Sequence, residues 1–174
     1  MEFALFVTAL GWMATGRTEA GISRVVLPRK SRDAAFEALV EGRGRIRTPL
    51  VERDATAFDS LASRLQRFME GHKVEFPDRL DTTGWTPFSR RVWETTRQIP
   101  YGQTWSYGRV AAAMGQPRAC RAVGQALHRN PVPVIIPCHR VIGADSGLTG
   151  FGSGLELKQT LLRLESSAGA TSLP

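Results

Sequence analysis

Cysteine, histidine and long apolar runs are scarce in this sequence, and each scarcity excludes a class of protein. The 174 residues include two cysteines, Cys120 and Cys138, and three histidines. Two cysteines are too few for a disulfide framework, and no Cys/His pairs have the short spacing of a four-ligand zinc site. No apolar run is long enough to span a membrane, and no signal-peptide pattern opens the chain. We therefore expect a cytoplasmic protein with no metal, no cofactor and no membrane contact.

The overall composition is that of a folded protein with an excess of basic residues. Hydrophobic residues make up 42% and charged residues 22%, enough for one moderate domain or two small ones. The formal net charge is +7. Such a charge attracts polyanions, of which nucleic acid is the common one. It is equally compatible with a basic protein whose charge only confers solubility, so composition alone leaves both interpretations open.

The first half of the chain is predicted to be a small α/β scaffold with an antiparallel sheet. Alternating apolar residues and glycine turns predict strands at Phe3–Thr8, Gly11–Thr15 and Ile22–Leu27. Helical periodicity predicts helices over Ser31–Val40 and from an N-cap at Asp54 to just before Gly71. The remaining segments are expected to be a loop at Glu41–Glu52 and a linker at Val74–Gly84. We therefore expect a first domain over residues 1–80.

The second half is predicted to be mostly helical, with a domain over residues 85–166 and a flexible tail over 167–174. Thr86-Pro87 is a strong helix start, since a capping hydroxyl precedes a proline in the first turn. Two short helices, Tyr107–Met114 and Arg118–Arg129, flank the turn Gly115-Gln116-Pro117. This spacing is typical of a helix-turn-helix.

The second of these helices has one apolar face and one open face. A helical wheel places Ala119, Ala122, Val123, Ala126 and Leu127 inward and Arg121, Gly124, Gln125 and His128 outward. Arg121 is the one long cation on a smooth outer surface, which suits a narrow groove of DNA. An ordinary solvated helix face remains the alternative. Cys120 lies beside the apolar stripe and is interpreted as packing.

Cys138 is the strongest candidate for chemistry. It lies between Pro137 and His139, after the apolar segment Val132–Ile136. The thiolate is the nucleophilic form of cysteine, so a base or positive charge beside it decides its reactivity. We expect this sulfur to be held deprotonated. A small buried apolar residue is the alternative for a free cysteine taken alone.

Three further features surround this cysteine. Asn130 is expected to bond the backbone of the reactive turn, to cap the preceding helix, or to do both. Ser146–Gly154 contains four glycines and resembles a loop that closes over a ligand, and Ser153-Gly154-Leu155-Glu156 fits a capping box for the last helix. Glu165 lies at the edge of the apolar stripe Leu157, Leu161 and Leu164. It can turn inward to orient His139, or it can be an exposed residue near a frayed end.

These residues resemble the O6-alkylguanine-DNA alkyltransferases, the methylated-DNA–protein-cysteine methyltransferases of direct repair. The matching stretches lie between residues 84 and 165: Ile99-Pro100-Tyr101-Gly102, Ser106-Tyr107, residues 118–124, Asn130-Pro131 and residues 137–143. The resemblance implies an α+β chain whose helical second module carries a winged helix-turn-helix. It also implies irreversible, single-turnover transfer of the alkyl group of O6-alkylguanine, and of O4-alkylthymine, from double-stranded DNA to Cys138. Minor-groove binding, nucleotide flipping and a monomeric state belong to the same expectation.

The resemblance also assigns roles to individual residues. Cys138 is the acceptor, His139 its base through a water molecule, and Glu165 the residue that orients His139. Asn130 braces the turn, Arg121 fills the gap left by the flipped base, and Tyr107 contacts both the phosphate and the guanine. DNA-backbone contacts are implied for Ser89, Gly108 and Gln116, and pocket positions for Leu148, Phe151 and Gly152.

Two of these positions depart from the family's pattern. Phe151 and Gly152 replace a tyrosine and a serine of many relatives. Phe151 can stack on guanine without offering a hydroxyl, and the N–H of Gly152 can still donate to O6. We expect methyl transfer to be retained in a looser pocket. The competing interpretations are a non-catalytic binder of damaged DNA, a cysteine hydrolase and a winged-helix regulator.

Overall fold

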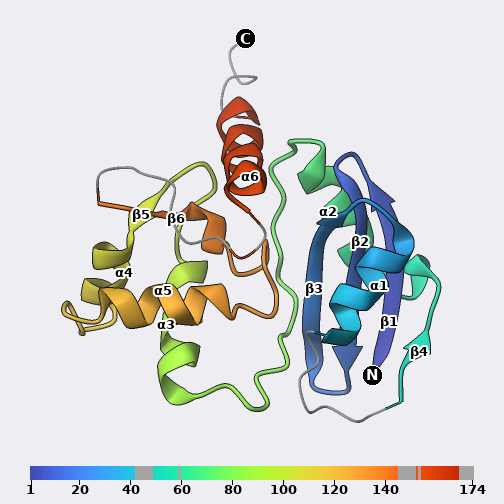
Figure 1. Cartoon of the computed structure of the whole chain (residues 1–174), viewed down its shortest axis with the longest axis horizontal. Helices are drawn as coiled ribbons and strands as arrows, with labels where there is room; N and C mark the ends of the chain where they lie inside the picture. The colour runs from blue at the N-terminus through green and yellow to red at the C-terminus, as the bar shows by residue number, and fades with distance from the viewer. Residues whose placement is uncertain (42–48, 59, 145–151, 153, 169–174) are drawn as a thin grey trace. The chain divides into compact units, whose positions relative to one another are not determined.

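The computed structural model describes residues 1–41, 49–58, 60–144, 152 and 154–168. The chain forms two compact units, Met1–Thr83 and Gly84–Pro174, whose elements are labelled in Figure 1. The first unit carries a sheet, and the second is mostly helical, as the sequence predicts.

The sheet of the first unit has the strand order β3-β2-β1-β4. Its strands are β1 (Glu2–Thr8), β2 (Gly11–Thr18), β3 (Gly21–Arg29) and β4 (Val51–Glu52). The first three are antiparallel neighbours, and β4 pairs in parallel with β1, so that Val51 lies opposite Glu2. Residues 42–48 of the expected loop Glu41–Glu52 lie outside the described residues, and the expectation was wrong at Glu41, which ends a helix, and at its last two residues, Val51 and Glu52. Their pairing with β1 depends on a partner some fifty positions away and leaves no local pattern.

Helices α1 (Arg32–Glu41) and α2 (Ser60–Met69) pack against this sheet. Successive residues of a strand point to opposite faces. Phe3 joins a cluster with Leu39 of α1, whereas the next residue, Ala4, is also fully buried on the other face. Both faces of the sheet are therefore covered.

The start of α2 differs from the sequence expectation. Asp54 caps a 3₁₀ helix, Ala55–Phe58, and not the first turn of an α-helix. Its Oδ1 accepts a hydrogen bond of 2.9 Å from the Thr56 N–H, two residues on, which is the geometry of an N-cap. Helix α2 is described from Ser60, and residue 59 lies outside the described residues.

In the second unit three helices pack against one another, and a fourth packs against the 3₁₀ turn Cys138–Arg140. These are α3 (Pro87–Arg97), α4 (Tyr107–Ala113), α5 (Cys120–His128) and α6 (Leu155–Ala168). Thr86 caps α3 by accepting a 3.1 Å bond from Ser89 N–H, with Pro87 in the first turn. The Trp93 indole N–H donates to the Ala126 carbonyl at 3.0 Å and ties α3 to α5. Helix α6 continues to Ala168, two residues into the expected tail, while Ser153 lies outside the described residues.

A short parallel ladder connects the helix-turn-helix to the reactive segment. Strand β5 (Trp105–Ser106) pairs with β6 (Val141–Ile142), which directly follows the 3₁₀ turn Cys138–Arg140. Because β5 leads straight into Tyr107, the ladder places the start of α4 beside the end of the reactive turn.

Candidate active site

The segment before Cys138 is rigid and tightly folded on itself. The Ile136 N–H donates to the Val132 carbonyl at 2.9 Å, and the Cys138 N–H donates to the Ile136 carbonyl at 2.7 Å. Val134 has φ 75°, a left-handed conformation that a β-branched residue seldom adopts. Val134 is 2% exposed, so the surrounding packing maintains this conformation. The turn presents Cys138 at a fixed position, with 8% of its surface exposed.

Asn130 bonds both ends of this segment with one side chain. Its Nδ2 donates to the Ile136 carbonyl at 2.8 Å and lies 3.2 Å from Cys138 Sγ, while its Oδ1 accepts from the Val132 N–H at 3.0 Å. The amide thus reaches the reactive turn and touches the sulfur itself. The Asn130 side chain therefore bonds the reactive turn, as a residue that braces this turn must, and the C-cap position of α5 is Arg129.

Glu165 lies inside the protein against His139 and Arg140. Its Oε1 is 2.7 Å from His139 Nε2, and both side chains are 1% exposed. Arg140 donates to the same carboxylate through Nε, at 2.9 Å to Oε2, and through Nη2, at 2.9 Å to Oε1. The Gly102 N–H donates to Oε2 at 2.9 Å. The exposed alternative for Glu165 is therefore excluded.

These contacts set the charges of the cluster. Burial raises the pKa of Glu165, but the hydrogen bonds from His139 and Arg140 outweigh it and lower the pKa to about 2. Burial lowers the pKa of His139, although its bond to Glu165 acts in the opposite direction. At neutral pH the carboxylate is ionised and the imidazole is neutral. A neutral imidazole can accept a proton, and a buried carboxylate beside it stabilises the resulting cation.

Lys158 is a further functional candidate, which its position in the sequence did not single out. It is 0% exposed, and its Nζ donates to the Val141 carbonyl at 2.7 Å. Burial lowers the pKa of Lys158, while the charge of Cys138 raises it. One signal was available: Lys158 precedes Glu165 by seven residues, which is two helical turns, so both face the same way on α6.

The sulfur is a neutral thiol in the free protein. Burial raises the pKa of Cys138, while the Asn130 hydrogen bond and the Lys158 charge lower it by less. The expectation that the sulfur is held deprotonated at rest was therefore wrong. Ionisation has to accompany the reaction, when the thiol proton can pass to a base.

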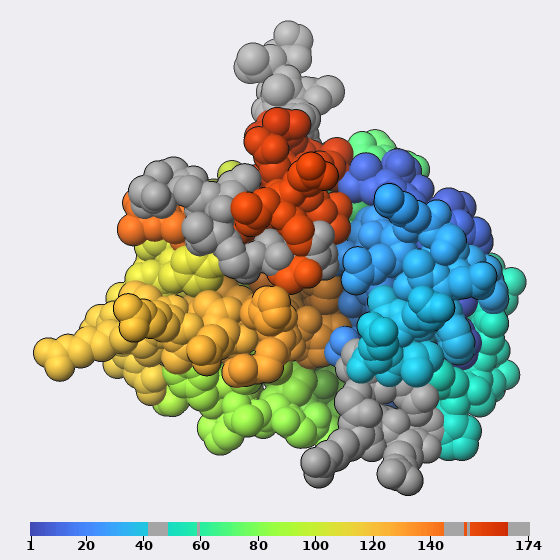
Figure 2. Space-filling model, viewed as in Figure 1, coloured from blue at the N-terminus to red at the C-terminus, as the bar shows by residue number. Residues whose placement is uncertain are grey.

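The outer face of α5 is open to solvent around Arg121. Arg121 and Ala122 are exposed, whereas Val123, Ala126 and Leu127 are buried. The inward placement of Ala122 was wrong, because the neighbouring helices bury a narrower stripe than the wheel suggested. Figure 2 shows α5 at the surface of the second unit. Gly124 is partly covered, since its missing Cβ would lie 3.6 Å from a ring carbon of Tyr107.

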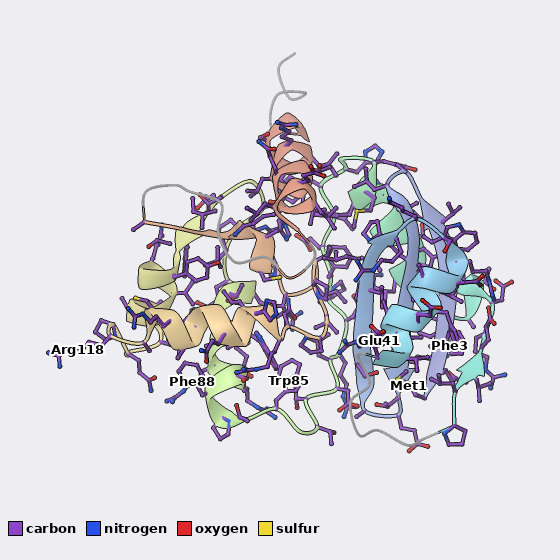
Figure 3. The ribbon with its side chains drawn as sticks, viewed as in Figure 1. Met1, Phe3, Glu41, Trp85, Phe88 and Arg118 are labelled. Carbon is purple, nitrogen blue, oxygen red and sulfur yellow. The ribbon has the colours of Figure 1, made fainter. Side chains whose placement is uncertain are left out.

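The remaining sequence candidates occupy different environments. Tyr107 begins α4, and its ring centre is 5.9 Å from Lys158 Nζ. Ser89 is 6% exposed within the cap of α3, and Gly108 lies beside Ser106 and Cys120. Gln116 lines a shallow hollow with Pro117, Arg118 and Ala119, from which the side chain of Arg118 projects outward (Figure 3). Leu148 and Phe151 lie outside the described residues.

Charge is concentrated in the unit that carries this site. From residue 84 onward the chain has ten Lys or Arg and four Asp or Glu residues, a net +6 of the total +7. Among the described residues no group of three His, Cys, Asp or Glu side chains is placed to hold a metal ion. No helix of the described chain is both long and apolar enough to cross a bilayer.

The comparisons with known proteins all identify the same family. Residues 87–167 match the family model described as 6-O-methylguanine DNA methyltransferase, DNA binding domain. A methylated-DNA–protein-cysteine methyltransferase of Methanosarcina acetivorans is 39% identical over 150 residues, which cover 86% of this chain and 96% of that protein. One of Mycobacterium leprae is 50% identical over 117 residues, 67% of this chain and 70% of that protein. The crystal structure of Mycobacterium tuberculosis OGT in complex with DNA superposes with a TM-score of 0.79 at 32% identity, covering 97% of this chain and 94% of that one.

Proposed function

Because this chain belongs to the methylated-DNA–protein-cysteine methyltransferase family, whose members repair alkylated DNA, we propose that Cys138 takes the alkyl group of O6-alkylguanine in double-stranded DNA and keeps it. The observation that carries this proposal is the chain of contacts Asn130–Cys138 and His139–Glu165–Arg140, which prepares one buried sulfur for attack. We extend the proposal to O4-alkylthymine, which presents the same alkyl–oxygen bond.

The reaction is a displacement at the alkyl carbon. A bond forms between Sγ and that carbon, the carbon–O6 bond breaks, and its electron pair stays on guanine. The thiol proton leaves through a water molecule to His139 Nδ1, because Glu165 holds Nε2. The departing guanine finally takes a proton at N1 from water, and the imidazolium of His139 returns its proton to water, so that the protons balance. The product is a thioether with no good leaving group, so each protein molecule reacts once.

Several charged and polar groups around Cys138 favour the loss of its thiol proton during the reaction. Burial lowers the pKa of His139 and keeps the imidazole neutral until the proton arrives, and the charge of Arg140, which shares the carboxylate of Glu165, acts in the same direction. Glu165 then stabilises the imidazolium. Lys158 and the Asn130 amide offset the negative charge that develops on Sγ in a site with little water, where such interactions are strong. Lys158 and Asn130 thus stabilise the thiolate only as it forms.

The open face of α5 supplies the DNA contact in this proposal. Arg121 is the long cation there, and Ala122 and Gly124 leave room for the helix backbone to approach a narrow groove. The target base has to leave the stack, since chemistry on a base cannot occur inside a duplex. Arg121 then occupies the gap in the duplex.

The test compares wild type and Cys138→Ala on duplexes that carry O6-methylguanine, O4-methylthymine or no lesion. Wild type should restore both lesions, and Cys138→Ala should restore neither while binding the methylated duplex with unchanged affinity. Repair by Cys138→Ala would refute the assigned nucleophile. Tight lesion binding by wild type without repair would favour a damage-binding protein, and hydrolysis of a thioester substrate would favour a hydrolase.

A further inference from the structure

The segment between Asn130 and Cys138 contains two residues whose backbone no proline restricts. Prolines at positions 131, 133 and 137 have a fixed φ, and the residue before each of them is held away from the helical conformation. Val134 and Ile135 are not prolines and do not precede one. The direction in which the chain runs through this turn therefore depends on these two residues.

Val134 has the unusual conformation of the two. Among the described residues it is the one residue other than glycine with a positive φ, which is 75°. In that region the β-carbon of a valine crowds its own backbone, and the surrounding structure has to outweigh the cost. The side chain of Val134 is buried, so its packing can do so. A return to the ordinary negative range of φ would send the following residues in another direction.

The turn around Val134 brings the Asn130 amide to the sulfur. The Ile136 N–H donates to the Val132 carbonyl across Val134 at 2.9 Å. The Asn130 side chain bonds both ends of this turn, through Oδ1 to the Val132 N–H at 3.0 Å and through Nδ2 to the Ile136 carbonyl at 2.8 Å. The same Nδ2 lies 3.2 Å from Cys138 Sγ. The contact between the amide and the sulfur therefore depends on the conformation of Val134.

We propose that Val134 is a positioning residue of the reaction, whose buried side chain holds the turn in the left-handed conformation that places the Asn130 amide against Cys138 Sγ. This inference rests on the proposed function, in which that amide stabilises the thiolate as it forms. Two parts of the valine act in opposite directions. Its packing holds the conformation, whereas its β-carbon opposes the positive φ.

Two substitutions distinguish positioning from packing. Val134→Ala removes the packing but keeps the β-carbon, so the turn should leave the left-handed conformation and the amide should move away from the sulfur. Val134→Gly removes more of the side chain, yet glycine adopts a positive φ at no steric cost, so the turn should persist. A side chain that only fills space would give the reverse order, because glycine leaves the larger cavity. Val92→Ala, which truncates a fully buried valine of α3, is the control.

Asn130 is the only asparagine of the chain, so isotope labelling of asparagine reports on its side-chain amide alone. The amide resonances of Val134→Gly and Val92→Ala should stay close to those of wild type, and those of Val134→Ala should shift toward a free amide. Single-turnover methyl transfer from an O6-methylguanine duplex should slow about tenfold in Val134→Ala, within the roughly 100-fold that a displacement of about 1 Å can cost. Transfer should slow less in Val134→Gly and stay unchanged in Val92→Ala, with the same duplex affinity throughout.

Two results would overturn the inference: an Asn130 amide that stays in place in Val134→Ala, or a Val134→Gly variant that is no faster than Val134→Ala or less folded than it. If Val134→Ala fails to fold while Val134→Gly folds and transfers the methyl group, the order supports the inference. If wild type transfers no methyl group, the proposed function is refuted, and the Asn130 resonances still decide whether Val134 positions the amide.

Discussion

Replacing Glu165 by glutamine tests the charge arrangement on which the proposed mechanism depends. The pKa of Glu165 is about 2 in the folded chain against 4.5 for a free carboxyl. At roughly 1.4 kcal/mol per pKa unit, this difference corresponds to about 3 kcal/mol of folding free energy. The variant also leaves the Arg140 guanidinium without its counter-ion, and breaking a buried pair in this way typically costs about 3–5 kcal/mol. We therefore expect Glu165→Gln to lose about 3 kcal/mol at neutral pH, or about 6–12 °C in Tm.

The contribution of Glu165 to the free energy of unfolding should depend on pH. Because the pKa of Glu165 is lowered by folding, its contribution is fully present above about pH 4.5 and disappears as the pH falls toward 2. The difference in unfolding free energy between wild type and Glu165→Gln should narrow over that range. Glu156→Gln, at an exposed position of the same helix, should match wild type throughout.

Urea unfolding at several pH values measures the loss of stability in Glu165→Gln and its dependence on pH. A difference in unfolding free energy between wild type and Glu165→Gln below 1 kcal/mol at pH 7 would refute the buried carboxylate as the source of stability. A difference that stays constant as the pH falls would refute it as well. A rate of thiol alkylation at pH 7 equal to that of wild type would separately refute its role in stabilising the His139 cation.

Three other substitutions address the sulfur and the DNA contact. Asn130→Ala removes the bonds to Sγ and to the Ile136 carbonyl, so the pKa of Cys138 should rise and repair should slow at least tenfold, as a stopped-flow pH profile would show. Lys158→Met removes the buried cation, and the pH profile of thiol alkylation should move to higher pH. Arg121→Ala should slow repair at saturating protein more than it weakens duplex binding, measured by single-turnover kinetics and fluorescence anisotropy.

Each of these predictions has a contrasting outcome. An unchanged pH profile in Asn130→Ala or Lys158→Met would mean that the thiolate is stabilised elsewhere. Arg91→Ala removes an exposed arginine of α3 and should weaken duplex binding without slowing repair at saturation. If Arg121→Ala behaves in the same way, the role of Arg121 in filling the duplex is wrong.

The sequence predicted the features that local chemistry determines. The cap at Thr86 with Pro87 and the glycine turn between α4 and α5 lie where the pattern indicated. The apolar stripe of the last helix indicated that Glu165 can turn inward, but residues alone could not decide whether it does. That decision depends on Arg140 and the Gly102 N–H, which fold against the carboxylate from other parts of the chain.

What the sequence did not predict depends on contacts between distant residues. Strand β4 exists because Val51 meets Glu2, and the raised pKa of Cys138 follows from burial by the whole unit. Lys158 was overlooked because a lysine in a helix is usually solvated.

The most direct test of the account is the stoichiometry and location of the transferred group. Wild-type protein is incubated with an excess of duplex carrying isotopically labelled O6-methylguanine, and intact and peptide masses are recorded. Every chain should gain one methyl group, on Cys138 and nowhere else, and repair should then stop. Label on any other residue, or many repaired bases per protein molecule, would contradict it.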